Sequence, residues 1–309
     1  MSFSKKIKHE ISRNTLFECC QRSQLSALIL MSSKLIINQD GISLQFATEN
    51  TYIAKRVWQL AKDLFDANLK LDVMVNQSFE QNKTYQVNII GNGLQVLSEL
   101  GLYDENGLKE AITLDDLENE CCERAFLAGA FMANGSVNSP NTTEYHLEIS
   151  SDSEKLSNLV QALMNKLSLD AKVIMRRKQH VVYIKQAENI SDLLRAIGSS
   201  NGVMEFEEAR IQRDFVNNFT RLDNCELANE VKVLTAASKQ LELIAKIEEH
   251  GLQSSLSPAH LEVIELRKQF PESSLNELTD EYYIMYGKTI TKSGLNHRFK
   301  RIEEIIHGK

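Results

Sequence analysis

The residues with the clearest chemical potential lie near the C-terminus of this 309-residue chain. Residues 286–302 contain no acidic side chain, and their basic residues are Lys288, Lys292, Arg298, Lys300 and Arg301. Lysine and arginine neutralise phosphates or reach guanine in the major groove of DNA. Asparagine can pair with adenine there, and Asn296 lies in the same stretch. The stretch therefore predicts DNA contact if one element presents these side chains together.

Three short helices are expected to position that stretch. Ser257-Pro258 opens the first, Ser273 or Ser274 caps the second, and Gly287 ends the second. The third begins near Thr291 or Ser293, and its core face is predicted to be Leu295, Phe299, Ile302 and Ile306. At about 100° per residue, the opposite face presents Ser293, His297, Lys300 and Arg301, with Lys292, Asn296 and Arg298 on the flanks. Residues 256–309 are thus predicted to form a helix-turn-helix with a groove-entering last helix; the alternative is a solvated basic face.

A second acid-free basic stretch, residues 171–185, is expected to form a hairpin. Its tip carries Arg176, Arg177 and Lys178, which are candidates for phosphate contacts; the alternative is a solvated hairpin tip. The whole chain is acidic, with a formal charge of −7, and residues 1–205 carry 21 basic and 25 acidic groups. Because the basic character is local, we expect weak long-range attraction to DNA and sharply placed contacts.

The chain repeats itself at a spacing of 102 residues. Glu18–Leu25 matches Glu120–Leu127 at five of eight positions. In each half an apolar helix (about 18–32 and 119–134) is followed by two strands, an amphipathic helix, two more strands and a short helix. Asn50 and Asp152 are the predicted N-caps of the amphipathic helices. The pattern predicts an αββαββα domain built twice, with residues 102–120 as a solvated acidic linker.

Small side chains characterise the first helix of each half. Ala128, Gly129, Ala130 and Ala133 make the second helix narrow, and Ser26, Ala27, Ser32 and Ser33 do the same for the first. Two such helices can approach each other closely. The stretch Arg124–Gly135 resembles the LAGLIDADG helix of homing endonucleases, whose metal-binding acid precedes the final glycine. Ser32 and Asn134 hold the equivalent positions here, so the resemblance implies a nuclease scaffold with degenerate metal positions.

Other chemistry is not indicated by the sequence. Two-metal hydrolysis needs carboxylates, and neither Ser32 nor Asn134 supplies one. The five cysteines (Cys19, Cys20, Cys121, Cys122 and Cys225) lack zinc-ligand spacing and are interpreted as buried, reduced thiols. No phosphate loop or nucleophile elbow is present, so we predict no catalytic residue, metal or cofactor. No apolar run is long enough to span a bilayer, and the basic N-terminus lacks the apolar core of a signal peptide, so we predict a cytoplasmic protein without membrane contact.

A helical connector is predicted between the duplicated domain and the helix-turn-helix. Over residues 206–255, apolar side chains recur at helical spacing, which suggests connecting helices with a core face. The first set is Phe206, Ile211, Phe215, Phe219 and Leu222, and the second is Val231, Leu234, Leu241, Ile244 and Ile247. Gly251 is expected to end the second run. The predicted fold class is therefore α+β, a two-repeat LAGLIDADG-like domain (1–205) followed by this connector and an all-α helix-turn-helix domain.

The chain resembles the WhiA family along essentially its full length. The stretches that carry this resemblance are Phe126–Ser136, Arg221–Lys232 and Lys292–Arg298. The resemblance implies a DNA-binding transcriptional regulator without nuclease activity, involved in sporulation in some lineages and in cell division or chromosome segregation in others. It implies DNA contact by Lys292, Ser293, Asn296, His297 and Arg298, to which the helical-face argument adds Lys300 and Arg301.

Two function classes follow from these observations. The first is a nucleoid-associated regulator that binds double-stranded DNA in promoter regions. The alternative is a scaffold that acts through a protein partner at the N-terminal domain, with DNA binding secondary; the acidic balance of residues 1–205 favours it.

Overall fold

The computed structural model describes residues 1–38, 41–75, 83–105 and 107–306. The chain divides into two compact units, Met1–Arg213 (unit 1) and Asp214–Lys309 (unit 2). Unit 1 mixes helices with antiparallel sheets and unit 2 is helical, so the predicted α+β class is confirmed.

Unit 1 repeats the order αββαββα, as the duplication predicts. The first repeat contains α2 (Glu18–Ser32), β1 (Ser33–Asn38), β2 (Gly41–Thr48), α3 (Thr51–Phe65), β3 (Leu69–Val75), β4 (Lys83–Ile89) and α4 (Gly93–Glu99). The second contains α5 (Glu120–Asn134), β7 (Gly135–Val137), β8 (Leu147–Ser151), α6 (Glu154–Lys166), β9 (Lys172–Arg176), β10 (Gln179–Ile184) and α7 (Ala187–Ala196). Gly101 and Gly198 follow the short last helices with φ of 69° and 82°, a conformation that glycine adopts without strain.

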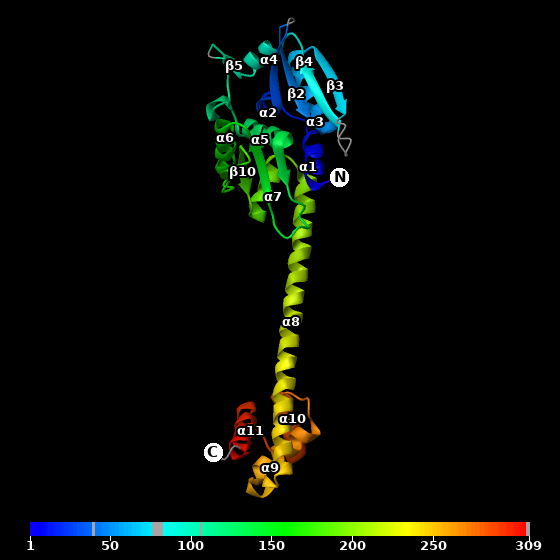
Figure 1. The fold of residues 1–309 in the computed structure, drawn as a ribbon, viewed down its shortest axis with the longest axis vertical. Coiled ribbons are helices and arrows are strands. Elements are labelled where there is room, and N and C mark those ends of the chain that lie inside the picture. The colour runs from blue at the N-terminus through cyan, green and yellow to red at the C-terminus, as the bar shows by residue number, and fades with distance from the viewer. Residues whose placement is uncertain (39–40, 76–82, 106, 307–309) are drawn as a thin grey trace. The chain divides into compact units, whose positions relative to one another are not determined.

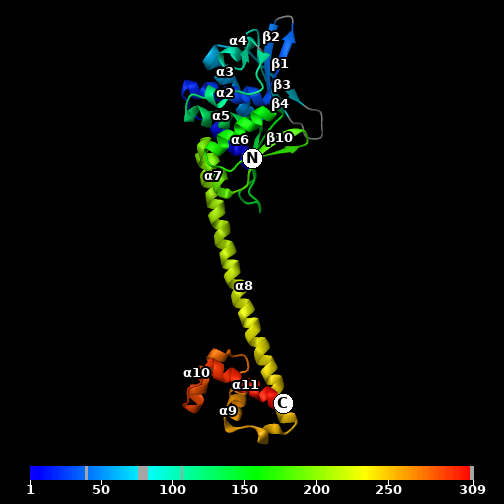
Figure 2. The ribbon, with the colours of Figure 1, turned by 90° about the vertical axis from the view of Figure 1, so that its left-hand side faces the viewer.

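Each repeat builds one antiparallel sheet, in the order β1-β2-β4-β3 or β7-β8-β10-β9. The register pairs Phe46 with Val87 in the first sheet and Ile149 with Val182 in the second, and all four side chains are buried. Figure 1 shows the two sheets with α2 and α5 between them, and Figure 2 shows α2, α3 and α5 on one side of the first sheet's strands. One hydrophobic core therefore spans both repeats.

Helices α2 and α5 pack closely, as their small residues predict. A Cβ added at Gly129 would lie 2.4 Å from the Gln24 carbonyl oxygen and 2.8 Å from the Ala27 Cβ. Any side chain at this position would push the two backbones apart.

Unit 1 contains one helix that was not predicted, and one of its two predicted helix caps is wrong. The N-terminal stretch, read from sequence only as a basic terminus, forms helix α1 (Phe3–Ile11) and buries Phe3, Ile7 and Ile11. Ser153, not Asp152, caps α6, because the Ser153 side chain accepts a hydrogen bond from the Leu156 amide. Asn50 caps α3 as expected.

The segment between the repeats is more than a solvated linker. It contains β5 (Tyr103–Asp104), β6 (Gly107–Leu108) and the 3₁₀ helix η1 (Leu114–Asp116). Ile112 and Leu117 are buried in the core of unit 1. The high content of acidic residues in this segment led to the prediction of a solvated linker and gave no sign that these two apolar side chains are buried.

The predicted connector is one helix, α8 (Ser200–Glu249), followed by η2 (Leu252–Ser255), and Gly251 between them has a φ of 66°. Its predicted core face is largely wrong. Phe206 is buried in the core of unit 1, and Ile244 and Ile247 are buried in that of unit 2. The side chains between them are exposed by 42–72%: Ile211, Phe215, Phe219, Leu222, Val231 and Leu234. Helical spacing identifies an apolar stripe but not whether another element covers it.

Unit 2 continues with α9 (Pro258–Gln269), α10 (Leu275–Tyr286) and α11 (Lys292–Ile306). Pro258 occupies the first turn of α9, Ser274 and Glu277 form a capping box on α10, and Gly287 ends α10 with a φ of 67°. These are the start and stop signals expected from the sequence. Among the described residues, no helix is both long enough and apolar enough to cross a membrane.

Candidate nucleic-acid interface

Helix α11 is held against α9 and α10 by one apolar face. Leu295, Phe299 and Ile302 are buried against Leu278 and Tyr282 of α10, as the sequence pattern predicts. Ile306 is only partly buried. The Thr291 hydroxyl accepts a hydrogen bond from the Gly294 amide at 3.1 Å and so begins the helix.

The opposite face of α11 carries most of the predicted DNA-contacting residues. The exposed ones are Lys292, Ser293, Asn296, His297, Lys300 and Arg301. The structure therefore brings six of the seven together on the accessible surface of one helix.

Arg298 differs from the other six because its side chain is engaged inside unit 2. Its guanidinium donates hydrogen bonds to the Ala259 carbonyl at 3.3 Å and to the Tyr282 hydroxyl at 3.0 Å. It also lies 5.5 Å from the centre of the Tyr282 ring and 4.0 Å from a Glu262 carboxylate oxygen. These contacts indicate that Arg298 holds α11 against α9 and α10. Contact with DNA stays a prediction for this residue.

Glu262 of α9 is the centre of this internal network. Lys288 donates to its carboxylate at 2.6 Å, and the Tyr282 hydroxyl donates to the second carboxylate oxygen. The hydrogen bond from Lys288, followed by that from Tyr282, lowers the pKa of Glu262. The same carboxylate raises the pKa of Lys288. One acid on α9 thus holds two of the five cations in the basic stretch.

The remaining cations are available to different degrees. Arg301 pairs with Glu304 at 2.6 Å, but both side chains are more than half exposed, and such pairs exchange readily with solvent. Within the described ranges, Lys292 and Lys300 have no ion-pair partner. Burial, followed by the charges of Arg298 and Arg301, lowers the pKa of His260 on α9, which indicates a positive potential beside α11.

The degenerate metal positions meet where α2 and α5 end. The Ser32 hydroxyl donates to the Asn134 side-chain oxygen at 3.2 Å, and the Asn134 amide nitrogen donates to the Met31 carbonyl at 3.1 Å. The two positions therefore lie together, as predicted, and a hydrogen bond joins the Ser32 hydroxyl to the Asn134 side-chain oxygen. Neutral groups of this kind are poor ligands for Mg²⁺.

A groove of about 740 Å³ adjoins this pair and is lined by α1 as well as by both repeats. Its charged lining residues are Lys5, Lys8 and Glu49. Burial lowers the pKa of Lys8 to about 8, and its ammonium lies 5.9 Å from the centre of the Phe131 ring. A single carboxylate beside two ammonium groups is a weak setting for two divalent ions.

The predicted basic hairpin is formed by β9 and β10, and its turn is Arg177-Lys178. Both turn residues have positive φ, 49° and 69°, as the two-residue turns that join tightly paired strands require. Both are exposed, as is Arg176, which also lies 3.7 Å from a Glu148 carboxylate on the same sheet. The hairpin and α11 belong to different units, so they are two separate candidate contact sites.

The interpretation of the cysteines needs correction. Only Cys20 and Cys122 are buried; Cys19 is half-buried, and Cys121 and Cys225 are exposed. The sulfur atoms of the two adjacent pairs also lie within 4.8 Å of one another. The spacing argument treated each pair alone and missed this cluster. The 102-residue repeat was the available signal, because it places both pairs at the same end of two helices that pack together.

Three family models match the chain in order. They describe the WhiA N-terminal LAGLIDADG-like domain (residues 18–103), the WhiA LAGLIDADG-like domain (123–216) and the WhiA C-terminal HTH domain (219–306). The chain belongs to the WhiA family. A relative from Bacillus mycoides described as "Probable cell division protein WhiA" is 37% identical over 306 residues, covering 99% of this chain and 96% of the relative. A Bacillus cereus protein of the same description is 36% identical with the same coverage.

Solved structures of WhiA proteins support the fold. The crystal structure of full-length WhiA from Thermatoga maritima has a TM-score of 0.62 at 21% identity and covers 100% of this chain and 99% of that one. A crystal structure of an N-terminal LAGLIDADG domain of WhiA has a TM-score of 0.51 at 22% identity, covering 64% and 90%. The WhiA helix-turn-helix is consistent with a DNA-binding protein.

Proposed function

We propose that this WhiA-family chain is a regulator of transcription that binds double-stranded promoter DNA through α11. The observation that carries the proposal is the single accessible face formed by Lys292, Ser293, Asn296, His297, Lys300 and Arg301. Its biological setting would be cell division, as the descriptions of the relatives suggest, with chromosome segregation or sporulation as further settings implied by the family resemblance. A protein with this activity would work in the cytoplasm, associated with the nucleoid.

The chemistry of α11 suits a helix lying in the major groove. The Asn296 side chain has an amide donor and a carbonyl acceptor, which complement the N7 acceptor and the N6 donor of adenine in the major groove. Lys300 and Arg301 lie about one turn further on, where they can reach phosphates or guanine. Ser293, beside the helix N-terminus, is placed for a phosphate oxygen. Arg298 would support this face from behind through Glu262 and Tyr282.

We further propose that the LAGLIDADG-like unit has no nuclease activity. Ser32 and Asn134 bond to each other where catalytic carboxylates would be needed. Linearisation of plasmid DNA in Mg²⁺ that depended on Asn134 or on a nearby acid would contradict this part of the proposal.

Fluorescence anisotropy against salt tests DNA binding directly. Genomic promoter fragments are titrated with wild type, with Lys300→Ala/Arg301→Ala, and with Lys239→Ala, which removes one exposed cation from α8. We expect the double variant to lose affinity and its salt slope to fall by roughly one to two units. We expect Lys239→Ala to bind as wild type does. Equal binding by all three proteins would refute α11 as the DNA reader.

The scaffold alternative is favoured by the acidic balance of residues 1–205. Complementation separates the two functions in the full-length protein. If Lys300→Ala/Arg301→Ala restores a deletion strain although it no longer binds DNA in vitro, the chain acts mainly through a protein partner of unit 1.

A further inference from the structure

Four cysteines meet where the first helices of the two repeats begin. Cys19 and Cys20 lie in the first turn of α2, and Cys121 and Cys122 lie in the first turn of α5. Their four sulfur atoms are all within 4.8 Å of one another, and those of Cys19 and Cys20 are 3.9 Å apart. Among the described residues, this is the one group of three or more histidine, cysteine or acidic side chains with the spacing of a metal site.

The sulfur separations suit a single ion. Zinc binds thiolates at about 2.3 Å, so the edges of a tetrahedral Zn–S₄ site measure about 3.8 Å. The cluster reaches this size if its longest separation contracts by about 1 Å, which rotation of cysteine side chains can supply. An iron–sulfur cluster holds several irons and sulfides between its thiolates, so it needs them farther apart.

All four cysteines lie in the first turns of their helices, α2 and α5. The first turn of a helix carries the positive end of the helix dipole, and such a position stabilises thiolates. A divalent ion takes thiolate ligands and releases their protons on binding.

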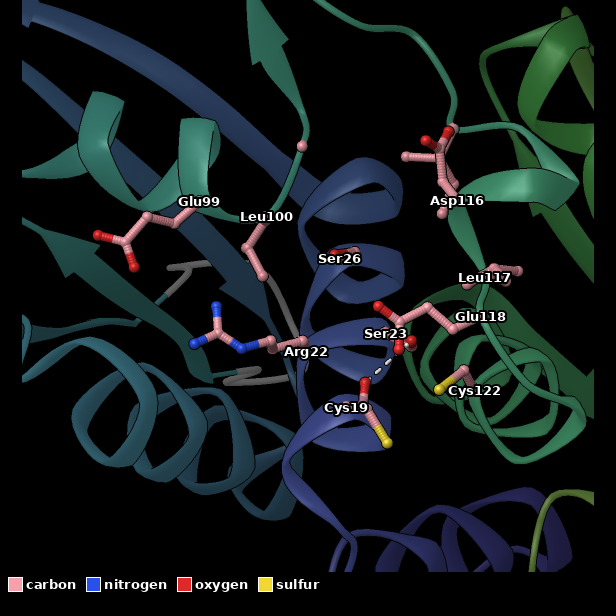
Figure 3. Close-up of a pocket in the computed structure, with 12 residues that line it drawn as sticks. Cys19, Arg22, Ser23, Ser26, Glu99, Leu100, Asp116, Leu117, Glu118 and Cys122 are labelled. Atoms are coloured by element: carbon pink, nitrogen blue, oxygen red, sulfur yellow. Dashed lines mark hydrogen bonds between the residues drawn. The ribbon is translucent and has the colours of Figure 1, made fainter.

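The cluster is accessible from two symmetry-related depressions. One, of about 270 Å³, is lined by Cys19, Arg22 and Cys122 (Figure 3). The other, of about 250 Å³, is lined by Cys20 and Cys121. Six of its other lining residues match those of the first at the 102-residue spacing; for example, Arg124 corresponds to Arg22. Each depression is therefore lined by one cysteine from each repeat, which gives an ion a route to all four.

We propose that Cys19, Cys20, Cys121 and Cys122 bind one Zn²⁺ ion, which joins the two LAGLIDADG-like repeats. Four protein ligands leave no open coordination position, so the site is structural. Soft thiolate ligands select zinc over the hard cations Mg²⁺ and Ca²⁺. The ion would fasten the N-terminal ends of α2 and α5, whose C-terminal ends are already joined by the Ser32–Asn134 hydrogen bond. This role is independent of DNA binding by α11.

Metal content of the full-length protein tests the proposal. The protein is purified under reducing conditions without chelator, and its zinc content is measured by inductively coupled plasma mass spectrometry. We expect about one zinc per chain and, after exchange for Co²⁺, a thiolate-to-cobalt charge-transfer band. The test variant is Cys121→Ser, because Cys121 is exposed and its loss leaves the core packed. The matched control is Cys225→Ser, an exposed cysteine on α8 outside the cluster.

The variants and controls distinguish the outcomes. Cys121→Ser should lose the zinc and the cobalt band, and its unit 1 should no longer gain thermal stability from added Zn²⁺; Cys225→Ser should behave as wild type. Cys19→Ala provides a second test if Cys121→Ser fails to fold. Zinc-free wild type, or zinc retained equally in Cys121→Ser, overturns the proposal. A metal-free protein whose intact mass matches one or two disulfides also overturns it.

Discussion

At the scale of single residues, the basic side chains of the C-terminal stretch divide into two roles. Arg298 and Lys288 pair with the Glu262 carboxylate inside the sequence of unit 2. Lys292 and Lys300 lie exposed on the outer face of α11. Charge counting treats all four as equivalent, whereas the contacts predict that substitutions at Glu262 and at Lys300 will affect different properties.

Replacing Glu262 with glutamine should weaken unit 2 without removing a DNA-contacting side chain. The variant loses charge-assisted hydrogen bonds from Lys288 and Tyr282 at a partly buried position, which we expect to cost about 1–2 kcal/mol at neutral pH. Urea unfolding followed by far-UV circular dichroism measures the loss. Glu303→Gln, at an exposed position of α11, is the control and should be nearly neutral.

The same substitution should alter the pH dependence of stability. Because the folded-state pKa of Glu262 is lowered from 4.5, its contribution is complete above that value and is lost as pH falls through the folded pKa. The difference in stability between wild type and Glu262→Gln should therefore shrink as pH falls below about 4.5. A difference that stayed constant down to acid unfolding would show that this carboxylate does not act through its charge.

At the scale of elements, the α2–α5 pair tolerates no side chain at its closest point. Gly129→Ala would gain up to about 1 kcal/mol in helix propensity. Its Cβ would meet the Gln24 carbonyl at 2.4 Å, and a backbone oxygen cannot rotate away. Overpacking of this kind costs about 1–3 kcal/mol, so we expect net destabilisation of unit 1.

Thermal unfolding of unit 1 measures this effect. Asn158→Ala, on the exposed face of α6, is the control, because it places alanine in a helix of unit 1 without a clash. It should be neutral or slightly stabilising. A melting temperature for Gly129→Ala equal to that of the control would mean that the two helices can separate without cost.

The elements that sequence predicts correctly are those whose signals are local. Ser274, Gly287 and the alternating strands of each repeat act on their own neighbours. Helix α1 was not predicted because its three apolar residues, each four apart, lie within a basic terminus, and only contact with the core of unit 1 shows that they are buried. The apolar stripe of α8 was wrongly assigned to a core because its helical spacing is clear, although no other element covers it among the described residues.

The candidate sites show the same division. The outer face of α11 follows from helical periodicity alone, so six of its seven predicted residues are accessible. The inward role of Arg298 depends on Glu262, which lies 36 positions earlier in the chain on another helix. The cysteine cluster depends on contact between segments 102 residues apart. Such pairings become predictable once the symmetry of a duplication is applied to side chains as well as to elements.

At the scale of the whole molecule, two hydrophobic cores share no residue. One includes Phe206 at the start of α8, and the other includes Ile244 and Ile247 near its end. The apolar side chains between them, from Ile211 to Leu234, contribute to neither core. Within the described residues each core is thus packed from its own side chains, and a solvated helical segment transmits little stability in water.

The two units should therefore unfold in separate transitions. Phe126 is fully buried in unit 1, so Phe126→Ala should lower the free energy of unfolding of that unit by about 3–5 kcal/mol. Leu295 is fully buried in unit 2, so Leu295→Ala should lower the free energy of unfolding of unit 2 by about 2–5 kcal/mol. Differential scanning calorimetry resolves the two, and each variant should leave the other transition in place because distant sites without shared partners act additively. If either substitution displaced both transitions together, α8 would couple the units, and loss of DNA binding could then no longer be assigned to α11 without first testing the stability of unit 1.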